Sequence, residues 1–349
     1  MSAAVAILGA GPAGLAVAHA LRRRGVPARI YEAGSQVAAG LRTLDPDLPL
    51  VSPPGLSWPH LPWPPGRRTF GGLVQALEAW SSELDIVFDF KVLDVEQVEA
   101  GYRLRGPSGV VEAAAVVGCT GIVSQPRLPP GLGPTAIPWW HTREVRPHHV
   151  QGRRDLLVVG GGVSAGEVLA TWLGTAAPTD RAALALRSPL RTAPHHLLGL
   201  DTHYLAWLPE HLPARLGERR LGLRTEPLLD AVAQRALRRG RIEKVSGFQR
   251  LEGEEVTLAD GSVRRPDAVI FATGYHHSTP VDPLLRFDAD GWPVLRRCEA
   301  RPGLYVVGMR FARSLASPFL RGIGRDAEYV ARQLAGRWPT APGSLRVTP

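Results

Sequence analysis

The stretch VAILGAGPAGLAVAHALRRR, residues 5–24, decides the fold of this chain. Four apolar residues typical of a buried strand lead into Gly9, Gly11 and Gly14, and an apolar pattern with helical spacing follows. Glycines at this spacing permit a tight turn, the close approach of a pyrophosphate and the packing of a helix against a strand. The segment therefore predicts a strand, a glycine loop and a helix that together hold a dinucleotide.

The plan of this segment occurs a second time. The apolar run Leu156–Val159 leads into Gly160, Gly162 and Ala165, and a second helical pattern follows. Both copies continue with two short strands joined by a glycine turn, and each closes on an apolar strand that ends in Thr-Gly. From the first glycine to the last, the copies span 112 and 114 positions. The repeat predicts an α/β fold with two doubly wound, Rossmann-like nucleotide-binding domains.

The residue that follows the second strand differs between the copies. Glu32, 18 positions after Gly14, is a carboxylate placed to accept hydrogen bonds from a ribose. Arg187 is at the corresponding position in the second copy, where its guanidinium can pair with a 2′-phosphate. The alternative is that Arg187 is one more surface arginine without a ligand. Two nicotinamide cofactors would have no partner for hydride exchange. The two sites therefore predict FAD in the first domain and NADPH in the second.

The two copies also set the expected domain limits. We expect the NADPH-binding domain, residues 152–275, to be inserted into an FAD-binding domain that comprises residues 1–151 and 276–349. An apolar run at residues 303–308 predicts one more strand of the first sheet, and a closing helix is predicted over residues 326–334.

A Pro/Trp-rich stretch at residues 46–65 cannot form a long helix or a central strand, so it is predicted to be a loop. Two aromatic side chains of this stretch, Trp58 and Trp63, and the pair Trp139 and Trp140 have two possible roles. They either form the walls of a pocket that faces the flavin and excludes water, or simply pack in their loops.

Composition excludes several other classes of protein. The chain has 349 residues and a net charge of +9, and its uncharged, mostly apolar residues 3–21 are better explained by a strand, a glycine loop and a helix than by a targeting segment. Most of the cationic residues are arginines, and they do not form a basic tail. No nucleic-acid partner is therefore expected. Cys119 and Cys298 are the only cysteines, which excludes a disulfide framework and a CxxC redox pair and favours a cytoplasmic protein. Neither a metal site nor a membrane contact is expected.

The motifs together resemble those of class B flavin-dependent monooxygenases, especially the bacterial CzcO-like and plant YUCCA-type members. The resemblance covers nearly the whole chain and is carried by GAGPAG (9–14), LPWP (61–64), TGIVSQPRLP (120–129), VVGGGVSAGEV (158–168), RSP (187–189), LGLDT (198–202) and ATGY (272–275). It implies that NADPH reduces FAD and that a flavin C4a-(hydro)peroxide then transfers oxygen from O2 to a small organic substrate. The possibility of a homodimer is left open.

Two other functions compete with this interpretation. One is an NADPH-dependent flavoprotein reductase that passes electrons to a disulfide, a quinone or a protein acceptor. The other is a flavin-bound sensor without catalytic turnover.

The fingerprint of the resembled family, FxGxxxHxxx(Y/F/W), is retained only at its histidine. Alignment on His141 places Thr135, Ile137 and Val145 at the other fingerprint positions. His141 is the one candidate catalytic residue. It either orients the segment between the domains, as the fingerprint histidine of the family is thought to do, or is a structural histidine.

The candidate cofactor contacts lie in the motifs and beside them. For FAD they are Gly9, Gly11, Pro12, Ala13, Gly14, Glu32, Arg42, Val92, Thr120, Gly121, Gly322 and Asp326. For NADPH they are Gly160, Gly162, Val163, Ser164, Ala165, Arg187, Thr273 and Gly274. Ser164 either donates a hydrogen bond to a phosphate or caps the helix that follows the loop.

Overall fold

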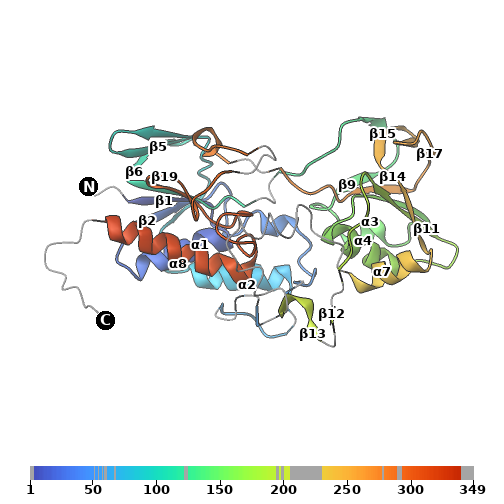
Figure 1. The fold of residues 1–349 in the computed structure, drawn as a ribbon, viewed down its shortest axis with the longest axis horizontal. Helices are drawn as coiled ribbons and strands as arrows, with labels where there is room; N and C mark the ends of the chain where they lie inside the picture. The colour runs from blue at the N-terminus through green and yellow to red at the C-terminus, as the bar shows by residue number, and fades with distance from the viewer. Residues whose placement is uncertain are drawn as a thin grey trace.

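The computed structural model describes residues 4–50, 52–53, 55–56, 58, 61–66, 68–121, 125–193, 196–197, 200–204, 230–276, 279–288 and 293–338. Residues 122–124 and 198–199, which belong to two of the expected motifs, lie outside this part. Two groups of sheets and helices lie at opposite ends of the molecule (Figure 1). The first group is built from the N-terminal and C-terminal parts of the chain, and the second from its middle.

A six-stranded sheet forms the centre of the first group. Its order is β19-β20-β7-β1-β2-β3, and all strands run parallel except β19. The strands are β1 (Val5–Leu8), β2 (Ala28–Tyr31), β3 (Ile86–Val87), β7 (Ala115–Gly118), β19 (Glu299–Arg301) and β20 (Leu304–Val306). Every residue of β1 and β7 is buried, as expected for parallel strands covered on both faces.

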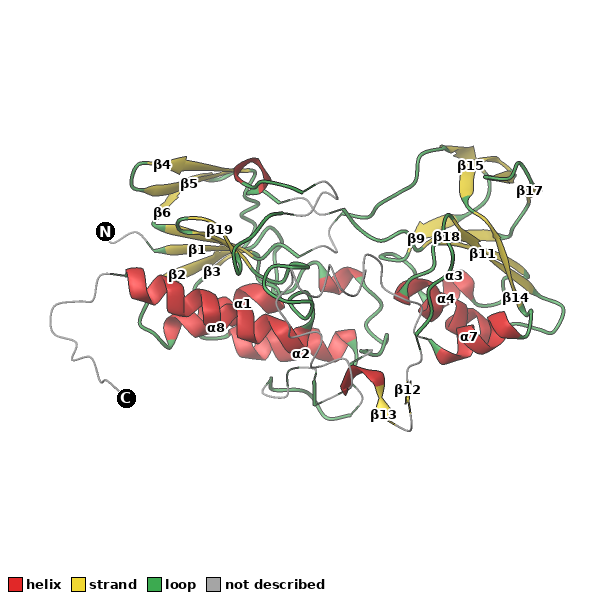
Figure 2. Ribbon diagram, in the orientation of Figure 1, coloured by secondary structure: helices red, strands yellow, loops and turns green. Residues whose placement is uncertain are grey.

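Helices cover one face of this sheet, and a small antiparallel sheet lies on the other side (Figure 2). The helices are α1 (Pro12–Arg22), α2 (Phe70–Ser81), α8 (Leu320–Arg337) and the short 3-10 helix η1 (Leu41–Thr43); a second 3-10 helix, η2 (Asp282–Leu284), lies beside the small sheet instead. The small sheet consists of β4 (Asp94–Val98), β5 (Gly101–Gly106) and β6 (Gly109–Ala113). Helices α1 and α8 lie side by side.

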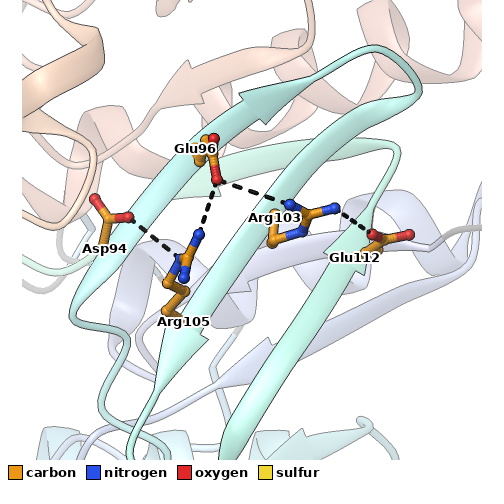
Figure 3. Close-up of polar contacts among 5 residues, drawn as sticks. All are labelled: Asp94, Glu96, Arg103, Arg105 and Glu112. Carbon is orange, nitrogen blue, oxygen red and sulfur yellow. Dashed lines mark hydrogen bonds and ion pairs between the residues drawn. The ribbon is translucent and has the colours of Figure 1, made fainter.

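The outer face of the small sheet carries a row of alternating charges (Figure 3). Arg105 lies between Asp94 at 4.0 Å and Glu96 at 3.2 Å, and Arg103 lies between Glu96 at 3.9 Å and Glu112 at 3.1 Å. Exposed ion pairs of this kind contribute about 1 kcal/mol or less to stability. Their effect is to keep this face of the sheet hydrated and unsuited to pairing with another sheet.

The second group contains a five-stranded parallel sheet of order β14-β11-β10-β18-β9 and a four-stranded sheet of order β17-β16-β15-β8. The strands of the first are β9 (Trp139–His141), β10 (Asp155–Val159), β11 (Arg181–Leu186), β14 (Ile242–Ser246) and β18 (Ala268–Phe271). Those of the second are β8 (Leu132–Thr135), β15 (Phe248–Gly253), β16 (Glu255–Leu258) and β17 (Val263–Arg264). The remaining elements of this group are α3 (Pro147–Val150), α4 (Val163–Leu173) and α7 (Ala231–Arg238). The hairpin of β12 (His196–Leu197) and β13 (Leu200–Asp201) lies between the two groups (Figure 1).

The path of the chain confirms the expected fold class of two doubly wound units, the second inserted into the first. After the second group, the chain returns to the first sheet, where β20 pairs with β7 in parallel. This is the additional strand predicted at residues 303–308. Strands β8 and β9 pair within the second group although they precede residue 151. The expected boundaries at 151 and 276 stay a prediction, and these pairings favour an earlier first boundary, between residues 121 and 132.

The closing helix is longer than predicted, because α8 begins at Leu320, six residues before Asp326. Gly322 and Gly324, in its first turns, have low helix propensity. Gly322, however, lies so close to the preceding turn that a Cβ would stand 2.1 Å from the carbonyl oxygen of Ala316. Only a glycine permits this approach, so the tertiary packing outweighs the low helix propensity of glycine.

Candidate functional site

The first glycine loop joins β1 to α1 and needs glycine at two of its three positions. Gly9 has a φ of +104°, and a Cβ there would lie 2.8 Å from the carbonyl oxygen of Cys119. A Cβ on Gly14 would lie 1.9 Å from the carbonyl oxygen of Gly9. A Cβ on Gly11, in contrast, would meet no described atom within 4 Å beyond its chain neighbours. The loop thus leaves space beside Gly11 at the start of α1, where backbone N–H groups and the helix dipole favour a pyrophosphate.

Pro12 and Ala13 form the first turn of α1. A proline here loses no hydrogen bond, because the first N–H groups of a helix have no partner within it. Ala13 is buried, and a Cβ on Gly308, which follows β20, would lie 2.9 Å from that of Ala13. The start of α1 is therefore packed against the chain at the end of β20.

Glu32 follows β2 at the same edge of the sheet and is buried. Its Oε2 accepts a hydrogen bond from the backbone N–H of Ala10 at 2.6 Å, and its Oε1 accepts one from the N–H of Gly34 at 2.9 Å. Two backbone donors thus hold the carboxylate against the glycine loop. Each carboxylate oxygen can accept a further hydrogen bond, so Glu32 can also receive the hydroxyl groups of a ribose.

Thr120 and Gly121 follow β7, which pairs with β1 beside the same loop. The hydroxyl of Thr120 is buried and has no hydrogen-bond partner in the part of the chain that the structure describes. A buried polar group without a partner costs free energy, and a bound group would supply that partner. Gly121 has a left-handed backbone with a φ of +65°. Together with the space beside Gly11, these features fit FAD at the carboxyl ends of β1, β2 and β7.

Arg42 and Val92 have partners within the protein. In η1, Arg42 donates from Nε to the carbonyl oxygen of Val37 at 3.0 Å and forms an ion pair with Glu78. The side chain of Val92 is buried in the hydrophobic core around the six-stranded sheet, called here the first core. Their contacts with FAD stay predictions.

Asp326 lies in α8, one turn after Gly322, and is only 1% exposed. Arg313 forms an ion pair with its Oδ1 at 3.2 Å. A buried carboxylate paired in this way can fix the segment that precedes α8 against the helix. The contacts of Gly322 and Asp326 with FAD also stay predictions.

The second glycine loop repeats the geometry of the first. Gly160 has a φ of +116°, and a Cβ there would lie 2.2 Å from the carbonyl oxygen of Ala272. Gly162 is the N-cap of α4, so Ser164 lies within the first turn and the expected alternative of a helix cap is wrong. The first turn of α4 also contains Val163 and Ala165. The start of α4 therefore has the same anion-binding character as the start of α1.

Arg187 lies beside this second loop. It follows β11, and the loop and Thr273–Gly274 follow the neighbouring strands β10 and β18, so all three lie at one edge of the sheet. Arg187 is exposed and forms no ion pair with any described residue. The guanidinium is therefore accessible to an anionic ligand such as a 2′-phosphate, as the prediction requires. The residues of this edge fit NADPH.

His141 uses both nitrogens of its ring in backbone contacts. Nδ1 accepts a hydrogen bond from the N–H of Arg143 at 3.2 Å, so the proton is on Nε2, which donates to the carbonyl oxygen of Gly274 at 2.9 Å. Burial lowers the pKa of His141, which favours this neutral form. The histidine thus connects β9 to the loop after β18, which agrees with a positioning role.

Two arginines that the sequence analysis did not single out connect the segment after His141 to the first group. Arg143 donates from Nε to the hydroxyl of Thr43 at 3.1 Å, and Arg146 donates from Nη2 to the carbonyl oxygen of Thr43 at 3.0 Å. Thr43 is the last residue of η1. No spacing distinguishes these two arginines from the many others in the chain.

The aromatic pair beside His141 belongs to strand β9 and not to a loop. Trp139 packs edge-on against Phe271 at 5.6 Å between ring centroids, and Trp140 packs against the hydrophobic cluster under α4 and α7. These contacts agree with the packing alternative, and a role beside the flavin stays a prediction. Trp58 and Trp63 pack against the first core, and Nε1 of Trp63 donates to the carbonyl oxygen of Trp58 at 2.9 Å.

Both cysteines are buried and neither forms a disulfide. Burial raises the pKa of each thiol well above its usual range, so neither is a thiolate at neutral pH. Among the described residues, no three His, Cys, Asp or Glu side chains are grouped to hold a metal ion. Within that same part of the chain, no helix is both long enough and apolar enough to cross a membrane.

The comparison with protein families agrees with these two nucleotide loops. The model of the family described as "Pyridine nucleotide-disulphide oxidoreductase" matches residues 3–308. The chain belongs to this family. Indole-3-pyruvate monooxygenase YUCCA1 of Oryza sativa subsp. japonica is 28% identical in an alignment of 380 positions. The alignment covers 95% of this chain and 91% of that protein.

Two further relatives extend the comparison. A CzcO-like oxidoreductase of Geobacillus kaustophilus is 24% identical, with 95% of this chain and 97% of that protein covered. The structure of a flavin-containing monooxygenase from Stenotrophomonas maltophilia has the same fold, with a TM-score of 0.76 at 22% identity over 96% of this chain and 99% of that chain. The expected enzyme class, an oxidoreductase similar to class B flavin monooxygenases, is confirmed.

Proposed function

We propose that this protein is an NADPH-oxidising, FAD-dependent monooxygenase that transfers one oxygen atom from O2 to a small organic substrate. The observation that carries the proposal is the pair of glycine loops with opposite charges beside them. The buried carboxylate of Glu32 lies at the first loop, and the exposed guanidinium of Arg187 lies at the second. A carboxylate suits the unphosphorylated ribose of FAD and would repel a 2′-phosphate, which a guanidinium binds.

The overall reaction balances as substrate, NADPH, a proton and O2 giving oxygenated substrate, NADP+ and water. Bound FAD supplies hydride acceptance from NADPH and the reaction with O2. The backbone N–H groups at the starts of α1 and α4 would hold the two pyrophosphates. Glu32 and Arg187 would select the nucleotide at each loop. His141 and Arg143 hold the segment between the two groups, so that the nucleotides are kept in a fixed relation.

The competing function is a reductase, which passes electrons from the flavin to an acceptor. A reactive cysteine thiol of this chain is one group that could carry out such a transfer to a disulfide. The two cysteines do not support this role, because both are buried and their pKa values are raised. Replacing both, Cys119→Ser and Cys298→Ser, is expected to leave NADPH oxidation unchanged. A large loss of turnover in the folded double variant would favour thiol chemistry.

The decisive experiment is a stopped-flow measurement of flavin absorbance after NADPH-reduced protein is mixed with oxygenated buffer, with and without NADP+. We expect a spectral species distinct from both reduced and oxidised flavin, and we expect it to last longer when NADP+ is present. Direct return to oxidised flavin in both cases, with rapid turnover of a quinone acceptor, would favour the reductase instead.

The substrate class can be tested with a compound named by a relative. Indole-3-pyruvate is the first candidate, because a relative at 28% identity is an indole-3-pyruvate monooxygenase. Without a substrate to oxygenate, a reduced flavin that reacts with O2 releases hydrogen peroxide. We therefore expect a true substrate to raise the ratio of oxygenated product to hydrogen peroxide. A cytoplasmic location and a homodimer stay predictions, the former resting on the two unpaired cysteines.

A further inference from the structure

A pocket outside both nucleotide loops lies between the turn before β19 and the C-terminal half of α8. Its volume is about 440 Å3, and it is lined by Arg296, Arg297, Glu299, Tyr329, Gln333 and Arg337. Strands β20 and β7 separate β19 from β1, so the pocket lies at the far edge of the first sheet from the glycine loop. None of the lining residues belongs to the expected FAD or NADPH contacts.

The charge of this pocket is unbalanced. Its single acid, Glu299, forms an ion pair with Arg337 at 2.7 Å and accepts a hydrogen bond from the hydroxyl of Tyr305 at 3.2 Å. Arg296 and Arg297 are exposed, and neither forms an ion pair with a described residue. Two arginines that are consecutive in the sequence therefore line a concave surface without an ion-pair partner among the described residues, which favours binding of an anion.

The backbone that presents these arginines is strained. Arg297 and Cys298 form a two-residue turn in which both have left-handed backbones, with φ values of 51° and 75°. Such turns are normally formed by Asn-Gly, because other side chains are disfavoured at positive φ. Here, Arg296 and Glu299 close the turn with backbone hydrogen bonds of 2.7 and 3.1 Å.

Buried Cys298 fixes the turn to the body of the protein. Its N–H donates to the carbonyl oxygen of Ala312 at 2.8 Å, and its side chain is fully buried in the first core. A long cationic side chain thus occupies a position where asparagine or glycine would be less strained. Local rules are broken in this way mainly at functional sites.

We propose that this pocket binds a small anion with at least two negative charges, of the organic phosphate or polycarboxylate class, in addition to the two nucleotides. Arg296 and Arg297 supply the charge, and the hydroxyl of Tyr329 and the amide of Gln333 add hydrogen-bond donors. The volume accommodates a small metabolite, in the lower part of the range for ligand pockets.

The test is isothermal titration calorimetry of the FAD-loaded, full-length protein saturated with NADP+, with pyrophosphate or citrate as the probe and ionic strength held constant. We expect one anion bound per chain. Arg297→Asn should weaken binding at least tenfold. Asparagine tolerates the left-handed backbone, so this variant should retain the turn and the unfolding temperature. Arg296→Gln tests the second arginine in the same way.

The matched control is Arg239→Asn, which removes the same charge from an exposed position at the end of α7. This variant should bind the anion as the unchanged protein does. Tighter binding of pyrophosphate identifies a phosphate ligand, and tighter binding of citrate identifies a carboxylate ligand. The proposal is overturned if neither probe binds, if NADP+ abolishes binding, or if Arg239→Asn weakens binding as much as Arg297→Asn.

Discussion

The first glycine loop offers a direct test of the FAD site, because two of its glycines have opposite surroundings. At Gly14, a Cβ would stand 1.9 Å from the carbonyl oxygen of Gly9, far inside contact distance. Gly14→Ala therefore forces the loop away from α1, at a cost of about 1–3 kcal/mol in the free energy of unfolding. At Gly11 a Cβ meets no described atom within 4 Å beyond its chain neighbours, and the φ of −85° suits alanine.

Gly11→Ala is accordingly expected to leave stability almost unchanged. Alanine gains about 0.4–1 kcal/mol from the unfolded state and loses a similar amount as the N-cap of α1. Its methyl group occupies the space that the pyrophosphate needs. Loss of one hydrogen bond to a charged phosphate costs about 1.5–3 kcal/mol, which raises the Kd for FAD about 10- to 150-fold.

The assay separates the two effects. Urea unfolding of the FAD-free protein measures stability, and quenching of flavin fluorescence during titration measures the Kd for FAD. Gly14→Ala should lower stability, whereas Gly11→Ala should lower only FAD affinity. The reasoning is refuted if Gly11→Ala binds FAD as tightly as the unchanged protein, or if it is destabilised as much as Gly14→Ala.

Three further predictions concern the second nucleotide and the segment between the two groups. Arg187→Ala should raise the Kd for NADPH about 10- to 100-fold, the effect of losing a charge-assisted pair, and leave the Kd for NADH unchanged; equal losses for both would contradict the 2′-phosphate role. His141 has a lowered pKa, so its contribution to stability is complete above its ordinary value of 6.5 and is lost as the pH falls through the lower folded value. The free energy of unfolding of His141→Gln should therefore decline less than that of the unchanged protein on acidification from pH 7, and parallel pH profiles would rule this out. Arg143→Ala removes a hydrogen bond to Thr43 and should slow flavin reduction by NADPH about 2- to 10-fold with both nucleotide affinities retained, which single-turnover kinetics can measure.

The nucleotide loops could be predicted because their signals are local in the chain. Gly9, Gly14 and Gly160 are required by contacts between a strand, the loop after it and the next helix, all within a short segment. Glu32 could be placed because the carboxyl ends of parallel strands meet at one edge of a sheet. The repeat of the plan then predicted both the number of units and their order.

Contacts between segments far apart in the chain could not be predicted in this way. Strand β9 pairs with β18, whose residues lie more than a hundred positions later, so the apolar pattern of β9 does not reveal its neighbour. Arg143 and Thr43 are likewise a hundred positions apart. The prediction also missed the first six residues of α8, where a Cβ on Gly322 would stand 2.1 Å from the carbonyl oxygen of Ala316 and glycine is therefore required.

The sequence by itself determined the two nucleotide-binding units, the charged residues that follow their second strands and the insertion of one unit into the other. These depend on the spacing of glycines and on residues at strand ends, which the chain specifies locally. Only the tertiary structure decided the tautomer of His141, the bonds from Arg143 and Arg146 to Thr43, and the pocket of unbalanced arginines beside α8. Each of these requires groups from segments far apart in the chain to meet, and only the packing of the sheets and helices sets those distances.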